Sequence, residues 1–339
     1  MLIAYNRPRR MNISSLSPSD LRQFRRALLR WYERYRRDLP WRRDADPYKV
    51  WVSEIMLQQT RVAAVLDHYE RFMRRFPTVQ TLARARESSV LAAWSGLGYY
   101  HRARRMHRAA KVIVRERYGN FPRTAEDWQA LPGIGRYTAG AIASIAFGEA
   151  AAVVDGNVER VLDRLFGQDG GREAVWQRAR SLLDRQHPGD FNQAMMELGA
   201  TVCTPRAPQC LLCPLNQWCQ SLGKYKRRAP APRKRKELCY ALALRKGSVL
   251  LTQRPEEASL MAGLWELPVA PEGRSHRQPV VRLRHSITDT DYRVAVIEMP
   301  AEELLPMKLR VDWFARKAWE RLPLTGLARK ILRKVSDAS

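Results

Sequence analysis

Hydrophobic residues recur with helical spacing through the first two thirds of the chain. The spacing i, i+4, i+7 and i+11 of the apolar residues Phe24, Leu28, Trp31 and Tyr35 predicts a helix over residues 20–37. A second apolar run follows Pro47 and predicts one long helix over residues 48–76. The pattern stays helical over residues 77–118, 138–147, 172–186 and 192–202.

The period changes to that of strands after residue 236. Strand-like runs cover residues 238–245, 248–254, 280–284 and 292–298. The dipeptide Lys246-Gly247 separates the first two and is typical of a hairpin, and a helix over residues 326–335 closes the chain. No strand signal of any strength comes earlier, so we predict an all-α part followed by a small α+β part.

Changes in composition suggest where these parts begin and end. The stretch YKRRAPAPRKRK is basic and rich in proline, which is typical of a solvated linker and also suits a phosphate backbone. We predict four segments: a basic arm over residues 1–17, a helical domain over 18–222, a linker over 223–236 and an α+β domain over 237–339.

The net charge of the chain indicates which kind of molecule it binds. The 339 residues include 60 Lys and Arg against 34 Asp and Glu, a net charge of +26. Such an excess points to a polyanion, with DNA or RNA ahead of an anionic membrane surface. No run of about 18 apolar residues is present, which predicts that nothing spans a bilayer. The N-terminus lacks the apolar core of a secretory signal, so we expect a reducing, cytoplasmic compartment.

Four of the five cysteines fall in one short loop. They follow the pattern C-x6-C-x2-C-x5-C and are Cys203, Cys210, Cys213 and Cys219. Thiolates so close in sequence predict a metal centre, with zinc and a four-iron, four-sulfur cluster as the candidates. Structural zinc sites usually pair their cysteines as two C-x2-C units, which this loop does not. Cys239 stands apart in an apolar run and is expected to be an inert core residue.

Glu54 lies inside the predicted helix that follows Pro47. Its helical neighbours are Val50, Trp51, Leu57 and Gln58, and none of them is basic. We therefore expect a buried carboxyl without a salt bridge, whose pKa is raised, as suits a general acid. The alternative is a structural glutamate that hydrogen-bonds to a neighbouring helix terminus.

Two glycine turns point to nucleic acid. In LPGIGRYTAGAI, a turn with Gly133 and Gly135 precedes a helix, whose N-terminal N–H groups favour a phosphate. Asp155 follows that helix as an isolated carboxylate, and its alternative role is an N-cap. In GLGYY, residues 96–100, two tyrosines follow a glycine turn beside arginines. They could form a wedge between bases or lie in the core.

These motifs together resemble one family. The chain resembles the adenine DNA glycosylase (MutY) family of helix-hairpin-helix, iron-sulfur DNA glycosylases from about residue 18 to 222. The motifs are LPWR (39–42), SEIMLQQTRV (53–62), GLGYY (96–100), LPGIGRYTAGAI (131–142), VDGNVERV (154–161), NQAMMELGA (192–200) and the cysteine loop. The C-terminal third, including RPEEASLMAGLWELP, resembles the Nudix-like domain with which this family recognises 8-oxoguanine.

The resemblance implies roles for individual residues. Glu54 matches the general acid that protonates the flipped adenine, and Asp155 the carboxylate that stabilises the oxocarbenium-like sugar. Such a division of labour also operates in glycoside hydrolysis. Tyr137 and Asn157 match residues that support the aspartate. The remaining matches are the adenine pocket (Trp41, Arg42, Gln193, Leu57), the residues inserted into the duplex (Gln59, Tyr99), the DNA-backbone hairpin (Gly133, Gly135, Arg136) and the [4Fe-4S] ligands (Cys203, Cys210, Cys213, Cys219).

Tyr137 distinguishes the predicted adenine glycosylase from the related endonuclease III branch. Endonuclease III carries at this position a lysine that forms a Schiff base and cuts the strand, which a tyrosine cannot do. The sequence thus predicts a monofunctional hydrolase, with a bifunctional glycosylase/lyase as the alternative. A second alternative is a non-catalytic iron-sulfur DNA-binding protein, against which the pairing of Glu54 with Asp155 argues.

The C-terminal part departs from the family at its expected lesion loop. The family carries a Phe-Ser-His loop after an Arg-His pair, whereas Arg284-His285 is followed here by Ser286-Ile287-Thr288-Asp289. The aspartate offers only acceptors when ionised, so we expect weaker discrimination for 8-oxoguanine or a loop in which His285 and Ser286 take over. No glutamate-rich Nudix box occurs, so nucleotide pyrophosphatase activity is not expected.

The resemblance also implies a partner and a setting. The expected partner is double-stranded DNA that carries adenine opposite 8-oxoguanine or guanine. The protein is expected to act as a monomer associated with the nucleoid.

Overall fold

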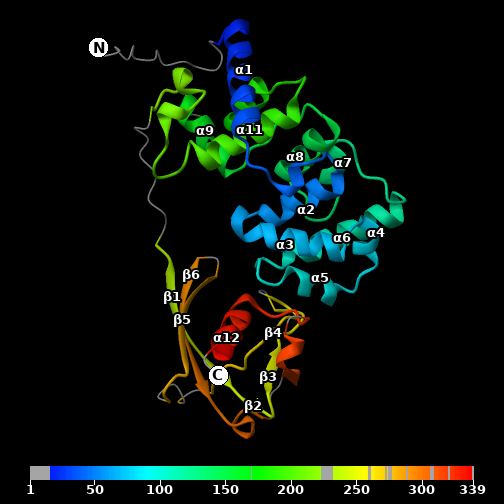
Figure 1. Cartoon of the computed structure of the whole chain (residues 1–339), viewed down its shortest axis with the longest axis vertical. Helices are drawn as coiled ribbons and strands as arrows, with labels where there is room; N and C mark the ends of the chain where they lie inside the picture. The colour runs from blue at the N-terminus through cyan, green and yellow to red at the C-terminus, as the bar shows by residue number, and fades with distance from the viewer. Residues whose placement is uncertain are drawn as a thin grey trace. The chain divides into compact units, whose positions relative to one another are not determined.

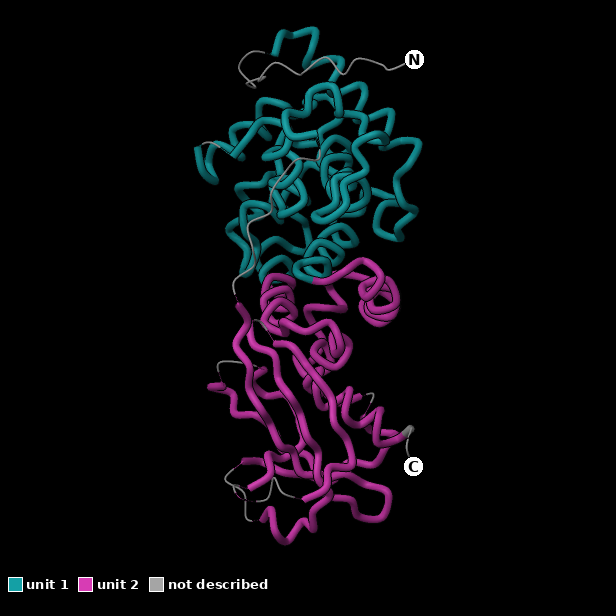
Figure 2. The backbone as a smooth tube through the Cα atoms, turned by 90° about the vertical axis from the view of Figure 1, so that its left-hand side faces the viewer, with its two compact units in different colours: residues 1–59, 112–229 teal, residues 60–111, 230–339 magenta. Residues whose placement is uncertain are grey.

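The computed structural model describes residues 16–168, 170–222, 232–258, 261–271, 273, 277–287, 289–305, 309–319 and 321–337. The chain divides into two compact units (Figure 2). Unit 1 comprises residues 1–59 and 112–229, and unit 2 comprises residues 60–111 and 230–339. This division differs from the expected boundary between helical and α+β parts, because residues 60–111 pack with the C-terminal residues. The expected arm and linker lie largely outside the described residues.

Unit 1 consists of helices and the turns between them (Figure 1). The helices are α1 (Pro18–Tyr35), α2 (Pro47–Leu57), α7 (Ala125–Gln129), α8 (Arg136–Phe147), α9 (Gly156–Phe166), α10 (Gly171–Leu182) and α11 (Pro188–Thr201), with the 3-10 helices η2 (Pro40–Arg42), η3 (Cys210–Leu212) and η4 (Asn216–Trp218). Helix α6 (His101–Glu116) crosses the boundary between the units. The helical assignment of this part is confirmed.

The helices of unit 1 pack against one another through a hydrophobic core. Helix α1 begins with a capping box in which Ser17 and Asp20 exchange hydrogen bonds, and it buries Phe24, Leu28 and Tyr32. Helix α11 packs against α1, α8 and α9. The ring of Phe24 meets that of Trp218 edge-on at 5.3 Å, which joins α1 to the cysteine loop.

The prediction of one long helix over residues 48–76 is wrong. The structure has two helices, α2 and α3 (Val62–Arg75), and Gln59 between them adopts φ 56°. Burial explains the break: α2 is buried almost all round, while α3 carries a single apolar stripe. A helix that is buried on all sides needs apolar neighbours all round, whereas a helix with one apolar stripe needs them on one side only. The chain therefore ends α2 and begins α3 between Leu57 and Val62.

Unit 2 combines helices with two small sheets. The helices are α3, α4 (Val79–Arg84), α5 (Glu87–Trp94), most of α6, and α12 (Gly326–Asp337). The strands are β1 (Lys234–Leu242), β2 (Leu244–Arg245), β3 (Ser248–Gln253), β4 (Trp265–Glu266), β5 (Val281–Ile287), β6 (Thr290–Glu298) and β7 (Val311–Ala315), with the 3-10 helices η5 (Ala301–Glu303) and η6 (Arg316–Ala318). Residues of α12 share a core with β3, β5 and β6.

The sheet topology confirms part of what the sequence predicts. One sheet has the order β1-β6-β5, with β1 parallel to β6, and the other joins β2, β3, β4 and β7. The hairpin at Lys246-Gly247 is present, because Leu244 pairs with Val249. Strands β4 and β7 were not predicted, and β1 begins inside the expected linker. Among the described residues, no helix has both the length and the apolar composition needed to cross a membrane.

Candidate active site

Glu54 lies in the middle of α2 and is almost fully buried, with 6% of its surface exposed. Tyr137 donates a hydrogen bond of 2.7 Å to Oε2 of Glu54. Burial raises the pKa of Glu54 to about 7; the charge on Asp155 adds to this, and the Tyr137 hydrogen bond and Arg42 oppose it. At pH 7 or below, a carboxyl with this pKa is protonated at least half of the time, so it can donate a proton.

Tyr137 stands in the first turn of α8 and meets two other helices. Besides Glu54 on α2, its hydroxyl lies 3.2 Å from Sδ of Met196 on α11. Burial holds its pKa well above the ordinary tyrosine value, and the charges of Glu54 and Asp155 act in the same direction. The hydroxyl therefore stays protonated as a donor. Its hydrogen bond goes to Glu54, not to the aspartate that the resemblance implies.

Asp155 is the N-cap of α9, so the structural alternative for this residue is realised. Its Oδ1 accepts from the backbone N–H groups of Asn157 (2.9 Å) and Val158 (2.7 Å). Its Oδ2 accepts from Nδ2 of Asn157 at 2.9 Å. Burial raises the pKa of Asp155, and these three donors oppose that rise by favouring the carboxylate. A capping role and a charged role are compatible.

Arg160 fixes Asn157, a contact that the sequence did not predict. Nη2 of Arg160 donates to Oδ1 of Asn157 and to the carbonyl of Gly199, both at 2.7 Å. The amide of Asn157 therefore turns its Nδ2 toward Asp155. A Cβ at Gly199 would lie 2.6 Å from Cβ of Asn157, so the glycine permits this approach of α11.

The Arg42 side chain forms an ion pair with a buried acid. Nη2 of Arg42 lies 2.9 Å from Oε2 of Glu197, and Nε of Arg37 lies 2.6 Å from Oε1 of the same carboxylate. The two arginines oppose the effect of burial and lower the pKa of Glu197. Sequence reasoning missed Glu197, although a lone acid within the apolar run AMMELGA is a signal of a partnered carboxylate.

The other expected pocket residues differ in exposure. Trp41 is buried, while Leu57 and Gln193 are half-buried. Gln58 donates from Nε2 to Oγ1 of Thr138 at 3.1 Å, so its amide links α2 to α8. Gln59 is exposed at the break after α2.

The hairpin between α7 and α8 leaves a helix end accessible. Gly133 has φ 80°, and Gly135 is the N-cap of α8 without a side-chain hydrogen bond. No atom lies within 4 Å of where a Cβ of Gly135 would stand, so the space beside the N-cap of α8 is open. Arg136 stacks over Trp176 at 3.9 Å and pairs with Glu173 at 2.9 Å. Its guanidinium is thus held in place at the hairpin.

The GLGYY turn distinguishes its two tyrosines. Tyr99 is half-exposed at φ 48°, a strained conformation for a residue with a side chain. Tyr100 is 3% exposed, and its hydroxyl donates to the carbonyl of Leu324 at 2.7 Å. Arg329 donates to Oγ of Ser95, which also contacts the Leu324 carbonyl. Within unit 2, Tyr100 is therefore a core residue, whereas the half-exposed side chain of Tyr99 can contact another molecule.

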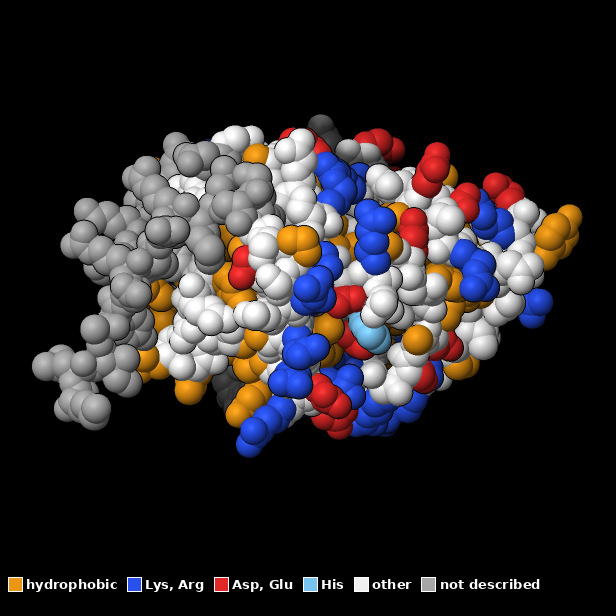
Figure 3. All heavy atoms as spheres, turned by 90° about the horizontal axis from the view of Figure 1, so that it is seen from above, with side chains coloured by type: hydrophobic (Ala, Val, Ile, Leu, Met, Phe, Trp, Pro, Cys, Tyr) orange, Lys and Arg blue, Asp and Glu red, His pale blue; other side chains and the backbone are white. Residues whose placement is uncertain are grey.

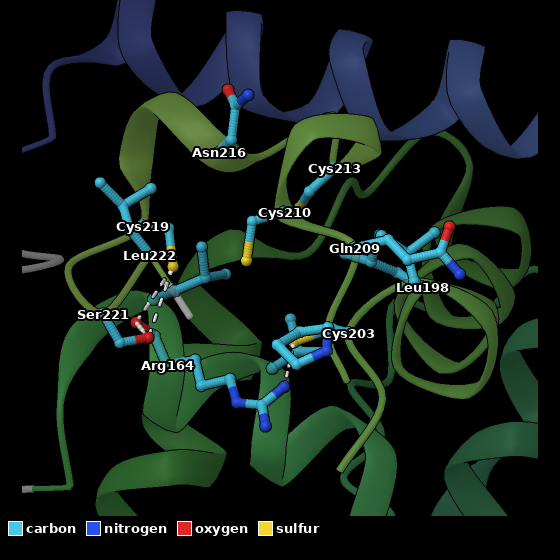
Figure 4. A pocket seen from close by; sticks show the side chains of 14 residues that line it. Arg164, Leu198, Cys203, Gln209, Cys210, Cys213, Asn216, Cys219, Ser221 and Leu222 are labelled. Carbon is cyan, nitrogen blue, oxygen red and sulfur yellow. Dashed lines mark hydrogen bonds between the residues drawn. The ribbon is translucent and has the colours of Figure 1, made fainter. Parts of the chain in front are cut away.

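The four cysteines of the loop line one cavity (Figure 4). Cys203, Cys210, Cys213 and Cys219 surround it together with apolar residues and Arg164. Arg164 donates to Sγ of Cys203 at 3.2 Å and to the carbonyl of Thr204 at 2.8 Å. Among the described residues, no three His, Cys, Asp or Glu side chains form a group suited to one metal ion.

Two thiols of this loop, those of Cys210 and Cys213, resist ionisation while no positive charge compensates them. Burial raises the pKa of Cys213 to about 12, and negative charge on the neighbouring cysteines raises it further. Burial also raises the pKa of Cys210. Four thiolates in this cavity would need a positive counter-charge, which metal ions supply.

The expected lesion loop is the tip of a β-hairpin in unit 2. His285, Ser286 and Ile287 end β5, and Ile287 pairs with Thr290 of β6. Thr288 lies outside the described residues. Ser286 donates to Oδ1 of Asp291 at 2.6 Å. Lys234 pairs with Asp289 at 3.3 Å, so that the negative charge of the tip is partly compensated.

The chain is similar to known DNA repair proteins. Residues 52–185 match the HhH-GPD superfamily of base excision DNA repair proteins. The adenine DNA glycosylase of Rattus norvegicus is 53% identical over 218 residues, which cover 60% of this chain and 42% of that protein. The adenine DNA glycosylase of Arabidopsis thaliana is 40% identical over 304 residues, which cover 74% of this chain and 48% of that protein. The chain thus spans less than half the length of these curated relatives.

A solved structure shares the fold of the helical part. A thermostable thymine-DNA glycosylase is 30% identical with a TM-score of 0.56, and the match covers 60% of this chain and 97% of that one. The superfamily match spans Glu54, the hairpin and Asp155. With these similarities, the chain belongs to the adenine DNA glycosylase (MutY) family within the helix-hairpin-helix base excision DNA repair superfamily.

Proposed function

We propose that this protein is a monofunctional DNA glycosylase that removes adenine opposite 8-oxoguanine or guanine. The observation that carries the proposal is that the site combines two carboxyl groups with different properties. Glu54 can be protonated near neutral pH and bonds to Tyr137 of α8, and Asp155 caps the N-terminus of α9. The relatives in rat and Arabidopsis, named adenine DNA glycosylases, support the choice of base.

Glu54 supplies the proton for departure of the base. Cleavage of an N-glycosidic bond leaves negative charge on the base, and protonation by a neutral acid relieves it. Burial keeps Glu54 protonated near neutral pH, and Tyr137 holds Oε2 in one orientation. The loss of this proton leaves a carboxylate that accepts a proton from the attacking water.

Asp155 opposes the positive charge that develops on the sugar. Its two carboxylate oxygens are held by Asn157 and by the N-terminus of α9, so the group need not reorganise during the reaction. The same split between a neutral acid and an anion operates in glycoside hydrolysis. Arg160 acts behind Asn157 as a positioning residue.

DNA must present the base outside the stack. The open N-terminus of α8 at Gly135 suits one phosphate of the backbone, held by its N–H groups. Gln59 is exposed and Tyr99 is half-exposed, both at positive φ, and we propose that each of them inserts into the duplex. Trp41, Arg42, Leu57 and Gln193 are proposed to line the adenine pocket.

Tyr137 favours hydrolysis over strand cleavage. A lyase needs an amine that attacks the sugar carbon, and Tyr137 offers a hydroxyl that stays protonated and bonded to Glu54. We therefore expect an intact abasic strand as the product.

We propose that the cysteine loop holds a [4Fe-4S] cluster. The residues fit such a group, because four thiols border one cavity and Arg164 donates to Cys203. A cluster supplies positive iron that compensates four thiolates and joins the loop covalently. The spacing C-x6-C-x2-C-x5-C supports a cluster over a single zinc ion, because structural zinc sites usually pair their cysteines as two C-x2-C units.

The α+β residues of unit 2 are proposed to be a Nudix-like lesion-recognition domain. The β5–β6 tip with His285, Ser286, Ile287 and Thr288 is the proposed contact to 8-oxoguanine. The monomeric state and the association with the nucleoid belong to the same proposal.

Single-turnover excision tests this function. Matched duplexes should carry adenine opposite 8-oxoguanine and opposite guanine, with and without an alkaline cleavage step. We expect adenine release that is faster opposite 8-oxoguanine and strand breakage only after alkali. Strand breakage without alkali would favour the lyase alternative, and no release from either duplex would refute the proposal.

A further inference from the structure

Arginine is the commonest residue in the lining of a groove in unit 1, apart from the residues assigned to the reaction. It has a volume of about 980 Å³ and runs between α1 and the segment that joins α10 to α11. Its cations are Arg22, Arg25, Arg26, Arg30, Arg36 and Arg185, against the acids Glu33, Asp184 and Asp190. Seen from the side of α1, Lys and Arg side chains gather across the middle of the surface (Figure 3). The groove is too large and too basic for a single small anion.

The groove is a built feature of the fold. Arg25 donates from Nε to the carbonyl of Leu182 at 2.9 Å and from Nη2 to that of Ser181 at 3.3 Å, which fastens α1 to the end of α10. On the opposite wall, Asp184 accepts from the N–H of Gln186 at 2.9 Å and that of His187 at 3.1 Å. These contacts engage Asp184 with its own loop.

Three arginines on α1 have no such task. Arg22, Arg26 and Arg30 are exposed, and no ion pair joins any of them to a carboxylate in the described part of the chain. They repeat every four residues, which spaces them about 6 Å apart along the helix. Successive phosphates of one DNA strand advance about 3.4 Å along the duplex axis, so every second phosphate lies about 6.8 Å further along. A stripe of this spacing therefore matches every second phosphate of a strand.

We propose that this groove is a second, sequence-independent binding site for the phosphodiester backbone of DNA. Guanidinium groups bind phosphate oxygens in a fork, and each contact releases a counterion without reading sequence. The site would lengthen the footprint of the protein beyond the nucleotides at Glu54 and hold undamaged DNA during search. The inference does not depend on the chemistry at Glu54.

The test compares two triple variants of the full-length protein. In the groove variant, Arg22→Gln, Arg26→Gln and Arg30→Gln are combined. The matched control removes three exposed arginines outside the groove, Arg34→Gln, Arg74→Gln and Arg115→Gln. Circular dichroism and thermal melting establish that both variants fold. Affinity is measured by anisotropy on short and long undamaged duplexes over a range of salt concentrations.

The proposal gives different results for the two variants. For the groove variant on long DNA, the slope of log K against log salt should become shallower by about 2.7, because three phosphate contacts contribute about 0.9 each. The control should keep the wild-type slope, and excision from a short duplex should be unchanged in the groove variant. An unchanged slope in the groove variant, or an equal loss in the control, would overturn the assignment.

Competition identifies the anion. Unlabelled undamaged duplex DNA should displace labelled long DNA from the groove of the wild-type protein. In the groove variant, the part of the binding that depends on the three arginines should be missing, and so should its displacement. Poly-glutamate or anionic vesicles that compete better than DNA, with the same dependence on the three arginines, would assign the groove to an acidic protein or a membrane and refute the proposal. Since undamaged DNA is the probe, this result stands apart from any failure of adenine excision.

Discussion

The hydroxyl of Tyr137 donates to Oε2 of Glu54 at 2.7 Å, across 83 positions of sequence. This bond lowers the pKa of Glu54, while burial raises it to about 7. Tyr137 thus tunes and orients the acid on which the proposed reaction depends. The resemblance places it where the lyase branch carries a lysine.

The rate of adenine release should fall as pH rises through about 7. Glu54 must be protonated to donate, and its protonated fraction declines above its pKa of about 7. Single-turnover rates between pH 5 and 9 measure this limb. Glu54→Gln should abolish release while DNA binding remains. A rate independent of pH across this range would assign the proton to another group.

Tyr137→Phe should move the midpoint of that pH profile upward. The change removes a hydrogen bond that lowers the pKa of Glu54 and keeps the ring, which packs against the hydrophobic core of unit 1. The same single-turnover series on the variant gives the shift. A lower rate at every pH with an unmoved midpoint would show that Tyr137 only orients the carboxyl. Thr138→Ala is a control, because it removes a neighbouring hydroxyl that contacts Gln58 instead.

The stability of the protein should also depend on Glu54. A raised pKa means that the folded state keeps a proton which the unfolded chain has already lost, so stability falls as pH rises from 4.5 to about 7. A shift of this size amounts to about 3 kcal/mol. Urea unfolding at pH 5 and pH 8 should show a smaller loss in Glu54→Gln than in the wild type. Equal losses would mean that Glu54 ionises in the fold as it does in the open chain.

Periodicity in the sequence was enough to predict most helices, the hairpin at Lys246-Gly247 and the burial of Glu54. These depend on local spacing, which a single sequence displays. The break at Gln59 was missed because positive φ in a residue other than glycine follows from packing, not from propensity. Strand β4 was missed because two residues carry too little pattern.

The site was predictable only where motifs carry it. The contact of Arg37 and Arg42 with Glu197 spans about 160 positions, and no local rule pairs them. The same holds for Arg160 and Gly199, which fix Asn157. For Asp155 the two sequence-based alternatives, N-cap and functional carboxylate, are not exclusive, because three N–H donors make a cap of the same group that the reaction needs charged.

Iron, and not zinc, should be found in the purified protein. The four cysteines border a cavity, and the thiol of Cys213 has a pKa of about 12 unless positive charge compensates it. Metal analysis and the visible absorption spectrum measure the content, with Cys239→Ser as a control that should keep the metal. Cys213→Ser should lose it and lower the melting temperature. Stoichiometric zinc with no iron would refute the cluster.

Asp155 allows its two roles to be measured separately. Asparagine caps a helix about as well as aspartate, so Asp155→Asn should keep the stability of the wild type and yet lose adenine release, because the charge is gone. Asp155→Ala removes cap and charge together and should lower stability by about 1 kcal/mol. Thermal or urea unfolding gives the first quantity, and single-turnover excision gives the second. Normal turnover in Asp155→Asn would show that the carboxylate serves α9 alone, and that the charge opposite the sugar comes from elsewhere.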